Sequence, residues 1–147
     1  MAAKKPSAEV SAGSMGRESK VRYLIDKQRQ LIRTTAEGCV RFDDIRDHQD
    51  RLLADPDFDG SFDQLIDTTP ATRFDISRHE AKILAQRRML SPEARRAFVA
   101  IKPHIFGLGR MMMIYHEGLK SAEVQLFYSM DEALKWLKRG EEKTWRS

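Results

Sequence analysis

The feature of this sequence that most constrains its fold is a regular alternation of strand-like and helix-like segments along most of its 147 residues. Two β-prone runs at the start are separated by only three residues, which is the spacing of a hairpin. Each later run is joined to the next through a helical segment, and such crossovers build parallel strands with helices packed on the sheet. The order predicts one α/β domain with a mostly parallel sheet after an antiparallel hairpin.

Hydrophobic periodicity and breakers place the individual elements. Strands are predicted at 21–26, 30–40, 62–67, 96–102 and 123–128, and helices at 42–53, 77–89, 103–118 and from 129 onward. Two helices begin with a capping box, Ser77 with Glu80 and Ser129 with Glu132. The composition predicts a disordered leader at 1–19, a folded domain at 20–140 and a polar tail at 141–147.

Composition narrows the class of protein. The single cysteine, Cys39, has no partner for an internal disulfide, which is typical of a protein from the reducing cytoplasm. No apolar run reaches the length that a membrane span needs. The net charge of +4 is the sum of unlike blocks. Residues 41–75 are acidic, with ten Asp against four Arg, and residues 76–102 are basic. This division argues against a nucleic-acid-binding stripe.

Motifs for metals, cofactors and catalysis are incomplete. The acidic run 55–63 matches an EF-hand loop at several positions, but Ile66 stands where the bidentate Glu belongs. Gly107 and Gly109 lack the companions of a phosphate loop, and more readily let their helix lie close to the sheet or to another subunit. We therefore predict no metal, no cofactor, no catalytic residues and no enzyme.

Polar side chains gather where the predicted parallel strands end, the edge at which open α/β sheets bind ligands. They include Asp67, Thr68, Thr69, Arg73, Asp75, Ser77, Arg78, Lys102 and His104. One interpretation is a polar rim in which Arg73 pairs with Asp67 or Asp75. The other is a site for an anionic ligand or a partner, built on Arg73, Lys102 and the helix start at Ser77.

The segment 103–118 is more hydrophobic than a helix that covers one face of a sheet requires. The excess predicts either a second buried face, and hence a homodimer or partner surface, or a helix enclosed within the monomer. The candidate interface residues are Phe106, Met111, Met112 and Tyr115.

The strand that ends at Asp67, the loop through Arg73 and the helix opening Asp75-Ile76-Ser77 resemble the STAS or SpoIIAA-like superfamily over about residues 21–139. In its anti-sigma-factor antagonists the matching stretch reads Asp-Ser-Ser-Gly, and a kinase phosphorylates the second Ser. Ser77 falls at that Ser, whereas Ile76 replaces the first and Arg78 replaces the Gly. The resemblance implies a SpoIIAA-like fold, and it looks closer to divergent, uncharacterised bacterial relatives.

Two functions follow as hypotheses. The first is a non-enzymatic regulatory or interaction module, switched at Ser77, that presents a basic flank to an acidic protein partner. That flank comprises Arg78, Lys82, Arg87 and Arg88. The second is a protein that binds a small nucleotide-like or lipid-like ligand at the strand edge or along the Met-rich helix. Ser77 also serves as a helix cap, which explains the residue without a switch.

Overall fold

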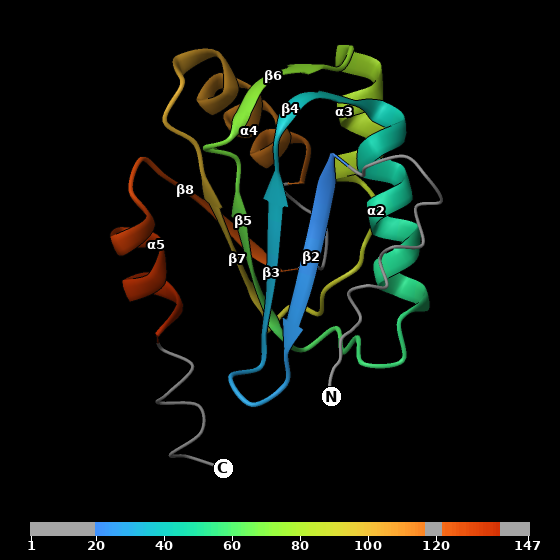
Figure 1. The fold of residues 1–147 in the computed structure, drawn as a ribbon, viewed down its shortest axis with the longest axis vertical. Coiled ribbons are helices and arrows are strands. Elements are labelled where there is room, and N and C mark those ends of the chain that lie inside the picture. Colours follow the sequence, from blue (N-terminus) through green and yellow to red (C-terminus); the bar gives the residue numbers. More distant parts are fainter. Residues whose placement is uncertain (1–19, 117–121, 139–147) are drawn as a thin grey trace.

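The computed structural model describes residues 20–116 and 122–138, and its elements follow the expected alternation (Figure 1). In chain order they are β2 (Val21–Asp26), β3 (Leu31–Ala36), β4 (Gly38–Arg41), α2 (Phe42–Ala54), β5 (Asp63–Asp67), β6 (Ala71–Asp75), α3 (Arg78–Ala85), β7 (Arg95–Val99), α4 (Pro103–His116), β8 (Glu123–Phe127) and α5 (Met130–Leu137). The predicted leader 1–19 and tail 141–147 lie outside the described residues.

Five strands form the main sheet in the order β2-β3-β5-β7-β8. β2 and β3 pair antiparallel, with Val21 opposite Ala36, and all other neighbours in this sheet are parallel. The predicted fold, a mostly parallel sheet with an antiparallel hairpin and packed helices, is confirmed. None of the helices within 20–116 and 122–138 is long and apolar enough to cross a membrane.

A second, two-stranded sheet joins β4 to β6, and the sequence prediction missed it. The single strand predicted at 30–40 is wrong because the chain turns at Gly38, whose φ of +71° favours glycine. The Gly38 N–H then donates to the carbonyl oxygen of Pro70 at 3.1 Å. The segment through Arg73 and Phe74, predicted as a loop, is strand β6 and lies parallel to β4.

Helices cover both faces of the main sheet. Leu65 and Ala97 pack with Leu137 of α5 on one face, and Ile32 packs with Leu52 of α2 on the other. Figure 1 shows α5 at the left of the strands and α2 at the right. Leu65, Ile32 and Leu52 are completely buried, and each such side chain stabilises the fold by about 1.5–3 kcal/mol.

The starts of α3 and α5 have the caps that the sequence predicts. Ser77 Oγ accepts a hydrogen bond from the Glu80 N–H at 3.1 Å, and Glu80 Oε1 accepts one from the Ser77 N–H at 2.9 Å. Ser129 Oγ accepts from the Glu132 N–H at 3.2 Å. However, α3 ends at Ala85 rather than at the predicted residue 89, and β7 is shorter than predicted at its C-terminal end.

Candidate functional site

A cavity of about 100 Å³ lies between the main sheet and the layer formed by α2, α3 and α4. Side chains at alternate strand positions point to the same face, so three strands each place a pair on the cavity wall. These pairs are Thr34 and Ala36 on β3, Gln64 and Ile66 on β5, and Arg96 and Phe98 on β7. A space of this size is several times what one water molecule needs.

The two glycines of α4 differ in how close they lie to the sheet. An added Cβ on Gly109 would lie 2.5 Å from Leu126 Cδ2 and 3.5 Å from Phe98 Cδ1, so α4 approaches β7 and β8 there more closely than any other residue allows. A Cβ on Gly107 would meet nothing within 4 Å. Of the two glycines singled out in the sequence, Gly109 is therefore the one required for contact with the sheet.

A row of polar side chains crosses the cavity wall from β7 to α2. Arg96 Nε donates to Gln64 Oε1 at 2.7 Å, and Gln64 Nε2 donates to Thr34 Oγ1 at 2.9 Å. Thr34 Oγ1 then lies 3.5 Å from His48 Nε2. Gln64, Thr34 and His48 are only 3–4% exposed, so the row belongs to the interior.

His48 lies at the end of this row. Thr34 Oγ1 accepts from Gln64, and the tautomer of the His48 ring decides whether Thr34 Oγ1 or His48 Nε2 is the donor between these two residues. Nδ1 has no hydrogen-bond partner among the described residues. Burial, with smaller contributions from the charges of Arg51 and Arg96, lowers the pKa of His48 to about 3. His48 is therefore neutral, with one buried ring nitrogen that has no hydrogen-bond partner among the described residues.

Arg96 brings a positive charge to the cavity without a carboxylate to balance it. No acidic side chain within 20–116 and 122–138 forms an ion pair with Arg96. Burial alone lowers its pKa to about 10, which still leaves the guanidinium protonated at neutral pH. Arg96 is half-buried, as expected on the wall of a partly open cavity. Among the described residues that line the cavity, Arg96 is the only Lys, Arg, Asp or Glu.

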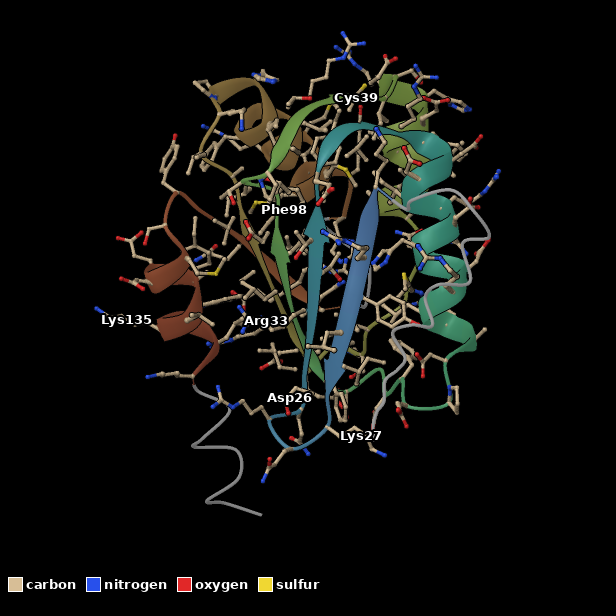
Figure 2. All side chains as sticks on the ribbon, in the orientation of Figure 1. Asp26, Lys27, Arg33, Cys39, Phe98 and Lys135 are labelled. Carbon is tan, nitrogen blue, oxygen red and sulfur yellow. The ribbon has the colours of Figure 1, made fainter. Side chains whose placement is uncertain are left out.

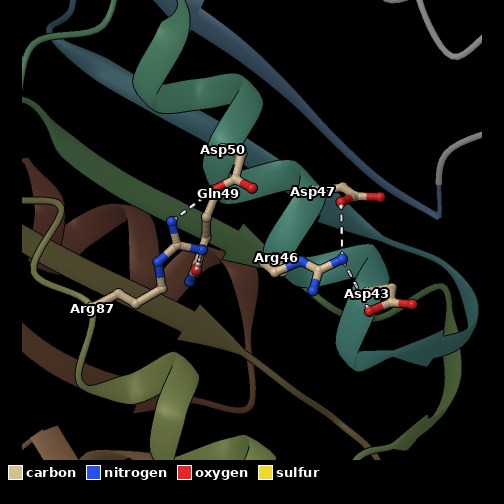
Figure 3. Close-up of polar contacts among 6 residues, drawn as sticks. All are labelled: Asp43, Arg46, Asp47, Gln49, Asp50 and Arg87. Carbon is tan, nitrogen blue, oxygen red and sulfur yellow. Dashed lines mark hydrogen bonds and ion pairs between the residues drawn. The ribbon is translucent and has the colours of Figure 1, made fainter.

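Ionic contacts tie the segment after α3 to α2 at the side of this cavity (Figure 3). Arg87 Nη2 lies 2.6 Å from Asp50 Oδ1, and Arg87 Nη1 donates to Gln49 Oε1 at 2.9 Å. Gln49 itself lines the cavity. Nearer the start of α2, Arg46 pairs with two aspartates of its own helix. Arg87 was predicted in the partner-facing basic flank, but its guanidinium is engaged within the monomer.

The predicted strand-edge cluster is partly assembled. Thr68 is 1% exposed, and its hydroxyl donates to the Val99 carbonyl oxygen at 2.7 Å. Asp67 Oδ1 accepts from the Thr69 N–H at 2.9 Å, and Lys102 Nζ donates to the Thr69 carbonyl oxygen at 3.1 Å. Asp67, Thr68 and Lys102 thus fix the ends of β5 and β7 through backbone contacts.

Arg73 and Asp75 lie instead on β6. Arg73 forms no ion pair with Asp67 or Asp75 in the described ranges, and its Nε donates to Cys39 Sγ at 3.3 Å. Hydrogen bonding to Arg73, with a smaller contribution from Arg41, lowers the pKa of the Cys39 thiol. Figure 2 shows Cys39 at the end of the molecule opposite the β2–β3 turn with Asp26 and Lys27.

The start of α3 is exposed to solvent. Ser77 and Arg78 are exposed, as are Lys82 and Arg88 farther along. None of these three cations forms an ion pair with another described residue. The Ser77 hydroxyl is engaged as the helix cap.

The four predicted interface residues on α4 have different environments. The Phe106 ring stacks on Tyr128 with centroids 4.1 Å apart, and Met112 lines the cavity. Met111 and Tyr115 are half-buried, while the neighbouring Ile114 is 66% exposed. Phe106 and Met112 are half-buried as well, and the homodimer with these four residues at its interface stays a prediction.

Comparison with solved structures agrees with the architecture. The chain is similar to an uncharacterised protein of the DUF3478 family from Shewanella loihica PV-4, whose crystal structure has a SpoIIAA-like fold. The two chains are 19% identical, the match covers 83% of this chain and 97% of that one, and the TM-score is 0.53. This chain thus has a SpoIIAA-like α/β fold. No protein-family model and no curated protein matches it.

Proposed function

We propose that this protein is a non-enzymatic binding module of SpoIIAA-like fold whose interior cavity holds a small, mostly apolar molecule. The observation that carries the proposal is the cavity of about 100 Å³, which has apolar walls and one row of buried polar groups. Protein interiors are close-packed, and an empty space of this size costs about 2 kcal/mol. A bound molecule would restore the lost contacts and offset that cost.

The size of the cavity sets the size of the occupant. An apolar cavity of roughly 150 Å³ is known to hold a benzene ring, so a space of about 100 Å³ suits a short chain or small ring. Because the cavity is partly open, a longer molecule can extend out of it. This location differs from the strand edge that the sequence suggested for a ligand.

Native mass spectrometry of the protein purified from cells tests this function. We expect a retained small molecule, and Ala36→Leu should remove it by filling the cavity. Thr35→Leu is the matched control, since Thr35 is the neighbouring residue on the opposite face of β3. Absence of a retained molecule, together with no uptake from a panel of short apolar compounds, would contradict the proposal.

A second candidate is the regulatory module with a switch at Ser77. It is supported by the exposed start of α3, where Arg78, Lys82 and Arg88 have no ionic partner among the described residues and Ile83 is 41% exposed. Such a face suits an acidic protein surface. Affinity capture with wild type, Ser77→Asp and Ser77→Ala tests it. Equal capture of the same partner by all three rules out the switch.

A further inference from the structure

The interior cavity also indicates the chemical class of its occupant. We infer that the bound molecule is a small apolar acid whose single carboxylate pairs with the guanidinium of Arg96. This inference rests on the proposed function, because it concerns the same cavity. It adds the head group, its charge and the residue that recognises it.

The charge of Arg96 is not balanced within the cavity wall. A charge that is partly removed from water and has no partner is unfavourable, so proteins pair such charges or use them on a ligand. Arg96 has no acidic partner in the described part of the chain, and no Asp or Glu stands among the described residues on the wall. A carboxylate on the occupant would supply the missing negative charge.

Arg96 also has free hydrogen-bond donors at the cavity wall. The Nε of Arg96 is occupied by Gln64, but its two terminal nitrogens make no hydrogen bond with a described residue. They form the planar pair of donors that fits the two oxygens of a carboxylate. His48 on the same wall has a ring nitrogen, Nδ1, without a hydrogen-bond partner among the described residues. Donors without acceptors indicate an occupant that supplies acceptor oxygens.

The Arg96 side chain is already held in place by its neighbours. The hydrogen bond from Nε to Gln64 fixes the guanidinium, and the bond from Gln64 to Thr34 fixes Gln64 in turn. A group held in this way needs little reordering when an anion arrives. The rest of the wall is apolar and suits a hydrocarbon tail, with Ile45, Ile66, Phe98, Leu108 and Met112 as its contacts.

The test compares three compounds with the same six-carbon chain: hexanoate, 1-hexanol and hexylammonium. Binding to the full chain is measured by titration with NMR detection. We expect hexanoate to bind wild type at least about tenfold more tightly than 1-hexanol, because a charge-assisted hydrogen bond contributes at least that factor. Hexylammonium should bind more weakly than either.

Two variants locate the preference. Arg96→Met should reduce hexanoate binding to the level of 1-hexanol or below, and Arg96→Lys should retain part of the preference. Arg95→Met is the matched control, since Arg95 is the adjacent arginine on the opposite face of β7, where its guanidinium lies over Trp136. It should keep the wild-type preference.

The outcomes separate this inference from the proposed function. If 1-hexanol binds wild type as tightly as hexanoate, the carboxylate inference is overturned and the apolar binding function stands. If hexanoate is preferred equally by wild type and Arg96→Met, the assignment to Arg96 is overturned. If none of the three compounds binds, both the inference and the proposed function fail.

Discussion

Arg96 Nε donates a 2.7 Å hydrogen bond to Gln64 Oε1, and these residues lie directly opposite one another on the parallel strands β7 and β5. The bond holds a positively charged group at the wall of an interior cavity without neutralising it. Such an arrangement lowers the stability of the empty protein and prepares it for an anion. Stability and binding should therefore respond in opposite directions to changes at Arg96.

Replacement of Arg96 by methionine should stabilise the ligand-free protein by about 1–2 kcal/mol. The change removes a desolvated, unpaired charge, and the loss of the bond to Gln64 only partly offsets this gain. Arg95→Met should instead cost about 1 kcal/mol, because Arg95 donates to the Trp136 carbonyl oxygen at 2.8 Å and lies over the Trp136 ring. Urea unfolding measures both, and destabilisation by Arg96→Met would contradict this account.

The two glycines of α4 should respond oppositely to alanine. Gly109→Ala should lower the free energy of unfolding by about 1–3 kcal/mol, since the new Cβ would overlap Leu126. Gly107→Ala meets open space in a helix and should raise it by about 0.5–1 kcal/mol. Thermal unfolding of the two variants provides the measurement. Equal effects would mean that α4 does not approach the sheet as described.

The stability of the protein should depend on pH through His48. Its pKa is about 3 in the folded protein and 6.5 in a model peptide, so the unfolded chain takes up a proton first as the pH falls. The stabilisation is complete above pH 6.5 and is lost progressively down to about pH 3. At pH 5 the loss is about 2 kcal/mol, from 1.36 kcal/mol per pH unit.

Urea unfolding of wild type and His48→Gln at pH 7 and pH 5 measures this contribution. The variant should lose about 2 kcal/mol less than wild type on acidification. His79→Gln is the control, because His79 is exposed. An identical pH dependence in wild type and His48→Gln would show that His48 is not buried as a neutral ring.

The cap at Ser77 should tolerate aspartate but not alanine. Ser77→Ala removes the acceptor for the Glu80 N–H and should cost about 1 kcal/mol. Ser77→Asp supplies an equivalent acceptor and should leave stability nearly unchanged. Chemical denaturation distinguishes them. A loss of the same size in both variants would show that a hydrogen-bond acceptor at residue 77 does not stabilise the start of α3.

Much of the architecture was predictable from the sequence because hydrophobic spacing and caps act locally. The hairpin, the parallel order and the Ser77 box all follow from short patterns. The β4–β6 pair was missed because a single residue, Gly38, marks the break before β4, and the polar composition of β6 resembles that of a loop. Pairing between such short strands depends on residues distant in sequence.

The sequence contains a pattern that marks three polar residues of the cavity wall. Strand alternation places Arg96 on the same face as Phe98, and Gln64 on the same face as Ile66. Helical spacing likewise places His48 on the face of Leu52. Each therefore stood out as a polar residue at an inward position. The cavity volume had no such signal, because it depends on how side chains from six or more elements fill the space.

The carboxylate site at Arg96 can be seen in a crystal structure of the protein grown with hexanoate. We expect the carboxylate within hydrogen-bond distance of the Arg96 guanidinium, with the hydrocarbon chain against Phe98 and Met112. Hexanoate bound only at the strand edge beside Lys102, or a cavity occupied by side chains alone, would contradict this expectation.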